Sequence, residues 1–233
     1  MSIVSQITNV LTPVHREGHV FIAIGAAATL VGFLIWSPLG WLLALATLVV
    51  AYFFRDPERV SPQTEGLVIA PADGKVILIE NVPPPPELEL GEEPLACISI
   101  FLTMLDVHVN RSPVTGRVLH TVHRPGVFHP ANEPEAKSEN ERRGFVLETR
   151  SGVRVGVVQI AGFVARRTVK FVDAGDMVVA GERFGLIRFG SRVDLYLPLS
   201  AAILIAEGQR MVAGETVMAD LNSKEPRRVV RRS

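Results

Sequence analysis

The step Gly190-Ser191, near the C-terminal end of the chain, could do chemistry on its own backbone. A serine hydroxyl can attack the carbonyl carbon of the residue before it, which turns the amide into an ester. Loss of the ester leaves a dehydroalanine, and hydrolysis of that group leaves a pyruvoyl ketone at a new N-terminus. The same dipeptide is also an ordinary tight bend, because glycine is the default turn residue. The step alone leaves both interpretations open.

Such a reaction needs a base for the hydroxyl proton and a group that orients the base. His108 lies at the end of a strand-like run, and Asp73 lies in a Pro-Ala-Asp-Gly turn between two runs. A lone histidine in a strand is more often structural, and an aspartate in such a turn is usually a turn residue. His108 and Asp73 are the candidate base and orienting group, although neither signal is specific alone.

The elements that must position these residues are short. After residue 66, runs rich in Val, Ile and Leu are separated by Gly, Pro, Asp and Asn, which is typical of strands. No long helical period follows residue 54, so the sequence predicts a mainly β domain. The polar stretch 131–143 is long enough for a functional loop or lid. Examples of the predicted strands are 67–70, 74–80, 96–102, 116–122, 144–148 and 153–160.

A short repeat relates residues 175–182 to residues 208–215, each copy with glycine at both ends of a tight hairpin. The pair resembles the paired hairpins of the barrel-sandwich hybrid fold of lipoyl and biotinyl domains. Those carriers hold their cofactor on a hairpin lysine, and neither copy here contains lysine. The repeat therefore predicts a barrel-sandwich-hybrid-like core and argues against a carrier role.

Residues 20–54 carry no charge, and Ser37-Pro38 divides them into two apolar runs. Each run would rise roughly 25 Å as a helix, slightly less than the bilayer core of about 30 Å. Arg16, Arg55 and Arg59 flank the pair, which keeps both ends cytoplasmic under the positive-inside rule. The sequence predicts a helical hairpin, residues 1–60 with its connector, that dips into or twice spans a cell membrane from its cytoplasmic face. A buried soluble helix pair is the alternative, and residues 61–233 form the β-rich domain.

Composition excludes several other functions. The chain has 24 basic and 24 acidic residues and 6% aromatic residues, so we expect no nucleic-acid partner. Cys97 is the single cysteine, which excludes an internal disulfide, and its apolar neighbours place it in a buried strand. His120 and His123 would lie on opposite faces of a strand, so we expect no metal site.

Five short motifs in order resemble the phosphatidylserine decarboxylase family, in particular its short bacterial and archaeal type. The resemblance covers roughly residues 50–220. It implies an inactive proenzyme that cuts itself between Gly190 and Ser191, into a β subunit of residues 1–190 and an α subunit of residues 191–233. Ser191 would become the pyruvoyl cofactor. The motifs are Arg55-Asp-Pro-Glu-Arg59, Pro71-Ala-Asp-Gly-Lys75, Asp106-Val-His108, Asn140-Glu-Arg142 and Gly190-Ser191.

The resemblance also implies that Ser191, His108 and Asp73 form the self-cleavage triad, with His108 as base and Asp73 orienting it. Longer relatives carry a second histidine three residues after the first, where this chain has Arg111. Either His108 alone serves both cleavage and the later proton transfer, or Arg111 takes part. The candidates for substrate contact are Arg111, His129, Asn140 and Arg166.

A pyruvoyl ketone condenses with a substrate amine to a Schiff base, which withdraws electrons from the adjacent carboxylate bond. The apolar hairpin points to a lipid that carries a serine head, so the implied reaction converts phosphatidylserine to phosphatidylethanolamine. A related lipid such as archaetidylserine, a soluble amino acid, or an uncleaved membrane-attached scaffold are the alternatives. The basic tail at 227–232 would favour an anionic membrane, and a homo-oligomer of the αβ unit stays open. Five cations are candidates for the phosphate or ordinary surface charges: Arg166, Arg167, Lys170, Arg188 and Arg192.

Overall fold

The structure is a computed structural model that describes residues 12–131, 133, 135–162, 167–188 and 191–223. It divides into two compact units, Met1–Glu58 and Arg59–Ser233. The first unit holds the apolar helices and the second holds all the strands named below. The predicted cleavage position Gly190, the candidate Arg166 and the basic tail lie outside the described residues.

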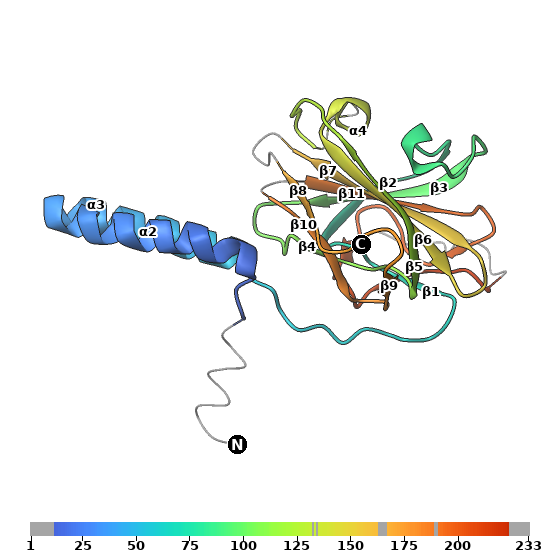
Figure 1. The fold of residues 1–233 in the computed structure, drawn as a ribbon, viewed down its shortest axis with the longest axis horizontal. Helices are drawn as coiled ribbons and strands as arrows, with labels where there is room; N and C mark the ends of the chain where they lie inside the picture. Colours follow the sequence, from blue (N-terminus) through green and yellow to red (C-terminus); the bar gives the residue numbers. More distant parts are fainter. Residues whose placement is uncertain (1–11, 132, 134, 163–166, 189–190, 224–233) are drawn as a thin grey trace, which may run out of the picture. The chain divides into compact units, whose positions relative to one another are not determined.

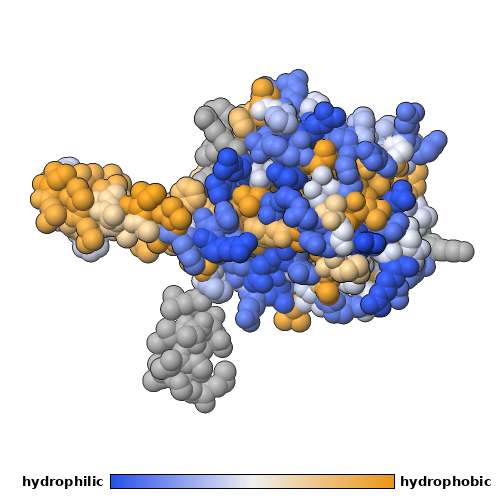
Figure 2. Space-filling model, in the orientation of Figure 1, coloured by the Kyte–Doolittle hydropathy of each residue, from blue (hydrophilic) through white to orange (hydrophobic). Residues whose placement is uncertain are grey.

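Helices α2 (Arg16–Ile35) and α3 (Ser37–Phe53) form a hairpin (Figure 1). The break is at Trp36, whose backbone is extended, and Pro38 lies in the first turn of α3, where its missing N–H costs no helical bond. A Cβ on Gly25 would lie 2.6 Å from the Thr47 hydroxyl, so this close packing requires glycine. Helix α2 is long and apolar enough to cross a membrane, and α3 is shorter. Figure 2 shows the apolar surface of the pair, and the predicted apolar helix pair is confirmed.

The large sheet is antiparallel, has eight strands and curls around the core (Figure 1). Its order is β13-β2-β3-β11-β7-β6-β5-β9. The strands are β2 (Gly74–Val82), β3 (Leu95–Leu102), β5 (Gly116–Arg124), β6 (Arg142–Thr149), β7 (Arg154–Ala161), β9 (Met177–Val178), β11 (Ser191–Leu197) and β13 (Arg210–Met211). The mainly β prediction is confirmed, and each predicted strand is present with bounds shifted by a few residues.

Two three-stranded sheets complete the domain, in the orders β1-β14-β12 and β4-β10-β8. The short helices η1 (Pro86–Leu88) and α4 (Ala136–Glu139) lie in connections, α4 within the predicted polar loop. The remaining strands are β1 (Leu67–Ile69), β4 (Val109–Arg111), β8 (Thr168–Lys170), β10 (Arg183–Ile187), β12 (Ala202–Ile203) and β14 (Val217–Asp220).

The strand pairing shows an internal duplication that is larger than the sequence repeat. The first half comprises β1–β3 with β11–β14, and the second half comprises β4–β10. Strand β13 pairs with β2 as β9 pairs with β5, and β14 pairs with β1 as β10 pairs with β4. Two backbone bonds between the halves are reciprocal: Ile69 donates to Pro113 and Arg111 donates to Pro71, both at 2.9 Å.

The duplication is broken at one end of the large sheet. In the second half, β6 runs into β7 through a tight turn after Thr149. In the first half, the corresponding strands β3 and β11 are neighbours but are not consecutive, so the chain crosses between the halves there twice. We call this the crossover end, where β3 ends at Leu102 and β11 begins at Ser191, and we call the opposite end, at Thr149, the turn end.

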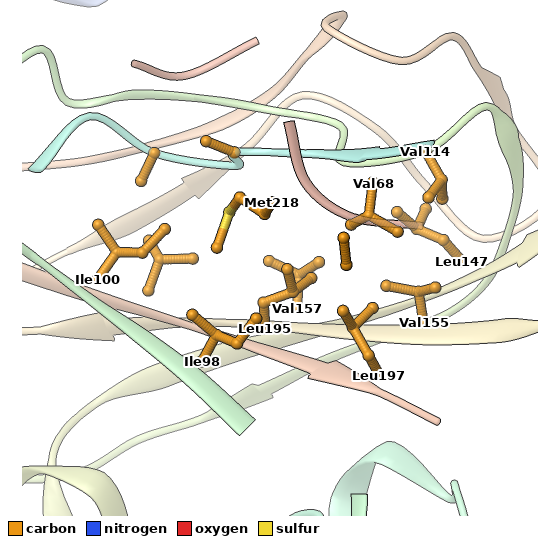
Figure 3. Packing of buried hydrophobic residues seen from close by; sticks show 14 of the residues in the cluster. Val68, Ile98, Ile100, Val114, Leu147, Val155, Val157, Leu195, Leu197 and Met218 are labelled. Carbon is orange, nitrogen blue, oxygen red and sulfur yellow. The ribbon is translucent and has the colours of Figure 1, made fainter. Parts of the chain in front are cut away.

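Apolar side chains from both halves fill the interior of the curled sheet. Figure 3 shows Ile98, Val157 and Leu195 from the central strands packed toward Val68 and Met218. A smaller cluster that includes Cys97 and Tyr196 lies on the outer face of the same strands. Since side chains alternate along a strand, β11 carries one set of residues into the interior and the other set to the outer face.

Candidate active site

Ser191 is the first residue of the central strand β11, between Leu102 of β3 and Ala161 of β7. By alternation with Val193 and Leu195, which belong to the interior cluster, its side chain lies on the inner face. Ser191 is completely buried, and its hydroxyl oxygen has no hydrogen-bond partner in the described part of the chain. A buried hydroxyl without a partner costs about 1–3 kcal/mol, which is unusual for a structural residue.

His108 is completely buried between the crossover end of β3 and strand β4. Its Nδ1 lies 2.9 Å from the backbone carbonyl of Asp106. A carbonyl only accepts, so Nδ1 carries a proton, and in the neutral tautomer Nε2 is the nitrogen that can accept one. The backbone oxygen of His108 accepts from Ile187, the last residue of β10. His108 is therefore held beside the strand that leads to Ser191, with Nε2 able to act as a base.

Asp106 locks the turn that carries His108, and it had no assigned role in the sequence interpretation. Its Oδ2 accepts from the backbone N–H of Thr103 at 2.8 Å and from the Thr103 hydroxyl at 2.7 Å, and its Oδ1 accepts from Arg210. A threonine three residues before an aspartate is a recognisable signal for such a turn. This side chain fixes the backbone carbonyl that orients His108.

Asp73 lies in the turn before β2, where it pairs with Arg59 at 2.9 Å and accepts from the Ala213 N–H at 2.7 Å. The second half has the same contact, since the Thr115 hydroxyl accepts from the Ala180 N–H at 2.9 Å. Asp73 is thus a structural acceptor for the hairpin turn, and its negative charge is the feature that Thr115 lacks. Its role beside His108 stays a prediction.

Two of the other candidates, Arg111 and Asn140, bind backbone carbonyls. Arg111 is buried and donates to the Gly181 carbonyl at 2.9 Å, at the far end of β4 from His108. Asn140 is also buried: its amide donates to the carbonyls of His129 and Ala161 and accepts from the His129 N–H. Asn140 thereby ties the predicted loop to Ala161, the β7 neighbour of Ser191. The ring of His129 is partly exposed and lies 3.0 Å from Glu139.

Arg192, predicted to be a surface charge or a phosphate ligand, is neither. It is buried on the outer face of β11, where it binds Asp194 at 2.6 and 3.1 Å and the Ser99 hydroxyl at 2.7 Å. Burial lowers the pKa of Arg192, but the adjacent Asp194 carboxylate outweighs it, so the pKa is raised. Burial raises the pKa of the neighbouring Cys97 thiol to about 12, which keeps it protonated and unreactive. These groups stabilise the strand that begins at Ser191.

The crossover end therefore holds a buried serine hydroxyl at the start of a strand, without a partner among the described residues, and a buried histidine whose ring the Asp106 carbonyl orients. A cavity of about 380 Å³, lined in part by Thr115, Thr149 and Val179, lies at the turn end instead. This arrangement defines the class: a mainly β protein with an apolar helix pair and a buried candidate nucleophile where its internal duplication is interrupted.

Comparison with known proteins identifies the family within that class. The profile described as phosphatidylserine decarboxylase matches residues 46–219. The phosphatidylserine decarboxylase proenzyme of Beijerinckia indica is 54% identical over 227 residues, which cover 97% of both chains. That of Nitrobacter winogradskyi is 52% identical over 217 residues, 93% of this chain and 88% of the relative. The chain belongs to the phosphatidylserine decarboxylase family.

Proposed function

We propose that this chain is the proenzyme of a phosphatidylserine decarboxylase that cuts itself between Gly190 and Ser191. The mature enzyme converts phosphatidylserine to phosphatidylethanolamine and carbon dioxide. The observation that carries the proposal is the buried Ser191 hydroxyl, which has no partner in the described part of the chain, at the first residue of β11. We interpret this lack of a partner as the property of a nucleophile that attacks the adjacent backbone.

In the first step, His108 Nε2 accepts the proton of Ser191 Oγ while Oγ attacks the carbonyl carbon of Gly190. The proton passes to the nitrogen of residue 191 as the C–N bond breaks, and an ester forms. Because the reaction is intramolecular, positioning can supply about 7–11 kcal/mol of the barrier reduction. In the neutral ring, the bond to the Asp106 carbonyl holds the proton on Nδ1, so Nε2 is the nitrogen that accepts.

In the second step, residue 191 loses its Cα proton and the Cβ–O bond breaks, so Gly190 keeps both oxygens as a carboxylate. The dehydroalanine at residue 191 takes up one water and releases ammonia, which leaves a ketone. This ketone supplies an acceptor for the electron pair that carbon dioxide leaves behind. The position fits such a group, because the inner face of β11 is apolar and makes no hydrogen bond to Ser191 Oγ among the described residues.

The two subunits stay together after the cut because their strands alternate. Strand β11 of the α subunit pairs on both sides with β3 and β7 of the β subunit, and β13 and β14 pair with β2 and β1. The bond from Arg192 to Ser99 also joins the subunits next to the new N-terminus. The reactive end of β11 is thus held in place without its covalent link to residue 190.

The apolar helix pair anchors the enzyme to the membrane that holds its lipid substrate. Helix α2 has the length and hydropathy of a membrane span, and its side chains are largely exposed. Basic residues at both outer ends of the pair, Arg16 and Arg55, favour the cytoplasmic face. A serine headgroup has the primary amine beside a carboxylate that the chemistry requires.

Intact mass of the purified protein, with phosphatidylethanolamine production measured in parallel, tests the proposal. The wild type gives two fragments, residues 1–190 and 191–233, and the smaller has a blocked N-terminus. Ser191→Ala gives one uncut, inactive chain. Ser112→Ala is the matched control, because Ser112 is equally buried but its hydroxyl already donates to the Val114 carbonyl at 2.7 Å. A fully active wild type with one continuous chain contradicts the proposal.

A further inference from the structure

Two large apolar side chains are exposed at the crossover end, beside the candidate site. Met104 is 49% exposed and Leu105 is 69% exposed. They occupy the middle of the turn from Thr103 to Asp106, which starts directly after Leu102, the β3 neighbour of Ser191. Exposed apolar residues that adjoin a functional site mark a contact surface more often than isolated ones do.

The turn that carries Met104 and Leu105 is held in one conformation. The Asp106 carboxylate accepts from both the N–H and the hydroxyl of Thr103, and the Asp106 N–H donates to the Thr103 carbonyl at 3.0 Å. Asp106 itself is buried. Because these hydrogen bonds hold the backbone of the turn, little backbone entropy is lost when Met104 and Leu105 bind a partner surface.

Two exposed cations lie next to this apolar turn. Arg210 of β13 pairs with Lys75 of β2, and Lys75 in turn pairs with Phe101 at the end of β3. The Arg210 side chain is 67% exposed and also binds Asp106, which connects it to the turn. Apolar side chains beside lysine and arginine match the interface of an anionic bilayer, which offers acyl chains and negative headgroups together.

The second half provides an internal comparison. Its turn from β6 to β7, which corresponds in position, carries Arg150 and Ser151 where the first half carries the exposed apolar pair. The apolar turn is therefore not a requirement of the duplicated fold. It occurs at the end of the sheet where Ser191 lies.

We propose that the Met104–Leu105 turn inserts into the membrane interface, with Lys75 and Arg210 against anionic headgroups, so that the crossover end faces a bilayer lipid. This inference rests on the proposed lipid substrate. It adds a second membrane contact, on the catalytic domain itself, to the helix pair. The contact presents the site to a headgroup that remains in the bilayer.

A label at position 105 tests the contact directly, without any dependence on turnover. Leu105→Cys in the full chain is labelled with a fluorophore and reconstituted into vesicles of equal parts phosphatidylcholine and phosphatidylglycerol with a quencher on the acyl chains. The buried Cys97 thiol stays unlabelled. Met177→Cys at the turn end is the control, since Met177 is 63% exposed. We expect quenching several-fold stronger at position 105, and equal weak quenching at both positions overturns the inference.

Kinetics provide the second test. For Met104→Ser with Leu105→Ser, we expect the apparent KM for phosphatidylserine in vesicles to rise about tenfold. Turnover of dispersed short-chain phosphatidylserine and self-cleavage should stay unchanged. The control, Met177→Ser with Val179→Ser, should leave both substrates unaffected. An equal loss on both substrates overturns the inference, because it reports damage to the site. A wild type that self-cleaves but does not act on phosphatidylserine refutes the proposed function, and the quenching result then still decides the membrane contact.

Discussion

The two halves of the β domain share their strand pairing but differ where chemistry is expected. At the turn end, Thr149 and Val153 close β6 onto β7, with their backbones joined at 2.9 Å and Gly152 at a φ of 80°. At the crossover end, Leu102 and Ser191 hold the corresponding positions in neighbouring strands, but no turn joins them. The candidate nucleophile Ser191 therefore occupies the position that Val153, an ordinary hairpin residue, has in the second half. At this position the two halves differ in how the chain connects their strands.

The same contrast extends to the surroundings of each position. Arg192 follows Ser191 and is buried in a pair with Asp194, whereas Arg154 follows Val153 and has a side chain that is 57% exposed. Asp73 carries a charge where Thr115 carries a hydroxyl, although both accept from the same place in the repeated hairpin. The second half therefore shows that the fold forms without a buried arginine or a charged acceptor at these positions. In the first half both groups lie at the crossover end.

Of the substitutions proposed here, removal of the candidate base His108 should have the largest effect, and it should act on the rate of self-cleavage. We expect His108→Ala to slow self-cleavage by about 10²–10⁴-fold, the usual contribution of a positioned general base. The decay of the full-length band after expression measures the rate. His120→Ala is the control, because the His120 ring is partly buried and lies 3.2 Å from the Glu87 carbonyl, away from the site. Normal cutting in His108→Ala with lost turnover would confine His108 to the decarboxylation.

Arg192 and Arg154, which follow Ser191 and Val153, allow the effect of a buried charge to be compared with that of an exposed one. Arg192→Met leaves Asp194 buried and unpaired, so we expect a loss of about 3–5 kcal/mol in the free energy of unfolding. Arg154→Met should change it by less than about 0.5 kcal/mol, because that pair is exposed. Chemical denaturation of the uncut Ser191→Ala protein measures both values. Equal effects of the two substitutions would show that the Arg192–Asp194 pair contributes no more to the free energy of unfolding than the exposed pair does.

Replacing the acceptor Asp73 with the residue type of its counterpart Thr115 tests the effect of the Asp73 charge on self-cleavage. Asp73→Thr supplies the hydroxyl that the second half uses, so the turn should form and the protein should fold. We expect self-cleavage to slow by roughly tenfold or more if the negative charge assists His108. Thr115→Ala removes the equivalent acceptor at the other end and should cost about 1 kcal/mol of stability without slowing cleavage. Unchanged cleavage in Asp73→Thr would restrict Asp73 to its structural bond.

The smallest effect is expected at Glu87 in η1, which pairs with Arg142 at 2.5 Å. Burial raises the pKa of Glu87, but the bond to Arg142 and further favourable contacts outweigh it, so the pKa is lowered below its ordinary value of 4.5. The pair therefore stabilises the fold above pH 4.5, and the contribution is lost as the pH falls through the lowered value. The melting temperature of Glu87→Gln should thus fall less than that of the wild type upon acidification, and parallel curves would contradict this.

Much of the fold could be predicted from the sequence because its signals are local. Alternating apolar runs and glycine-bounded hairpins identified the strands from 67 to 161, and the uncharged run identified the helix pair. Each repeat glycine has a positive φ, between 79° at Gly214 and 100° at Gly175, as tight hairpins require. Strand β11 was not among the strands named from the sequence, although Val193, Leu195 and Leu197 alternate along it.

The site could be predicted only in part. His108 and Ser191 were predicted from their chemistry, and their roles stay predictions. The Asp106 carbonyl that orients the ring belongs to the backbone and leaves no side-chain signal. Arg192 was misjudged because its burial depends on Asp194, Ser99 and the outer cluster, which come from different strands. Arg111 and Asn140 bind carbonyls that are 70 and 21 residues away. Such long-range pairings are not visible in spacing along the chain.

The sequence by itself determined the apolar helix pair, the β strands, the paired hairpins and the residue types capable of self-cleavage, since these follow from local periodicity and side-chain chemistry. Only the tertiary structure decided that the hairpins belong to a larger duplication and that Ser191 starts a central strand without a partner for its hydroxyl among the described residues. The physical reason is that burial and hydrogen bonding depend on which strands become neighbours. That arrangement is set by packing around a shared core and not by any single segment.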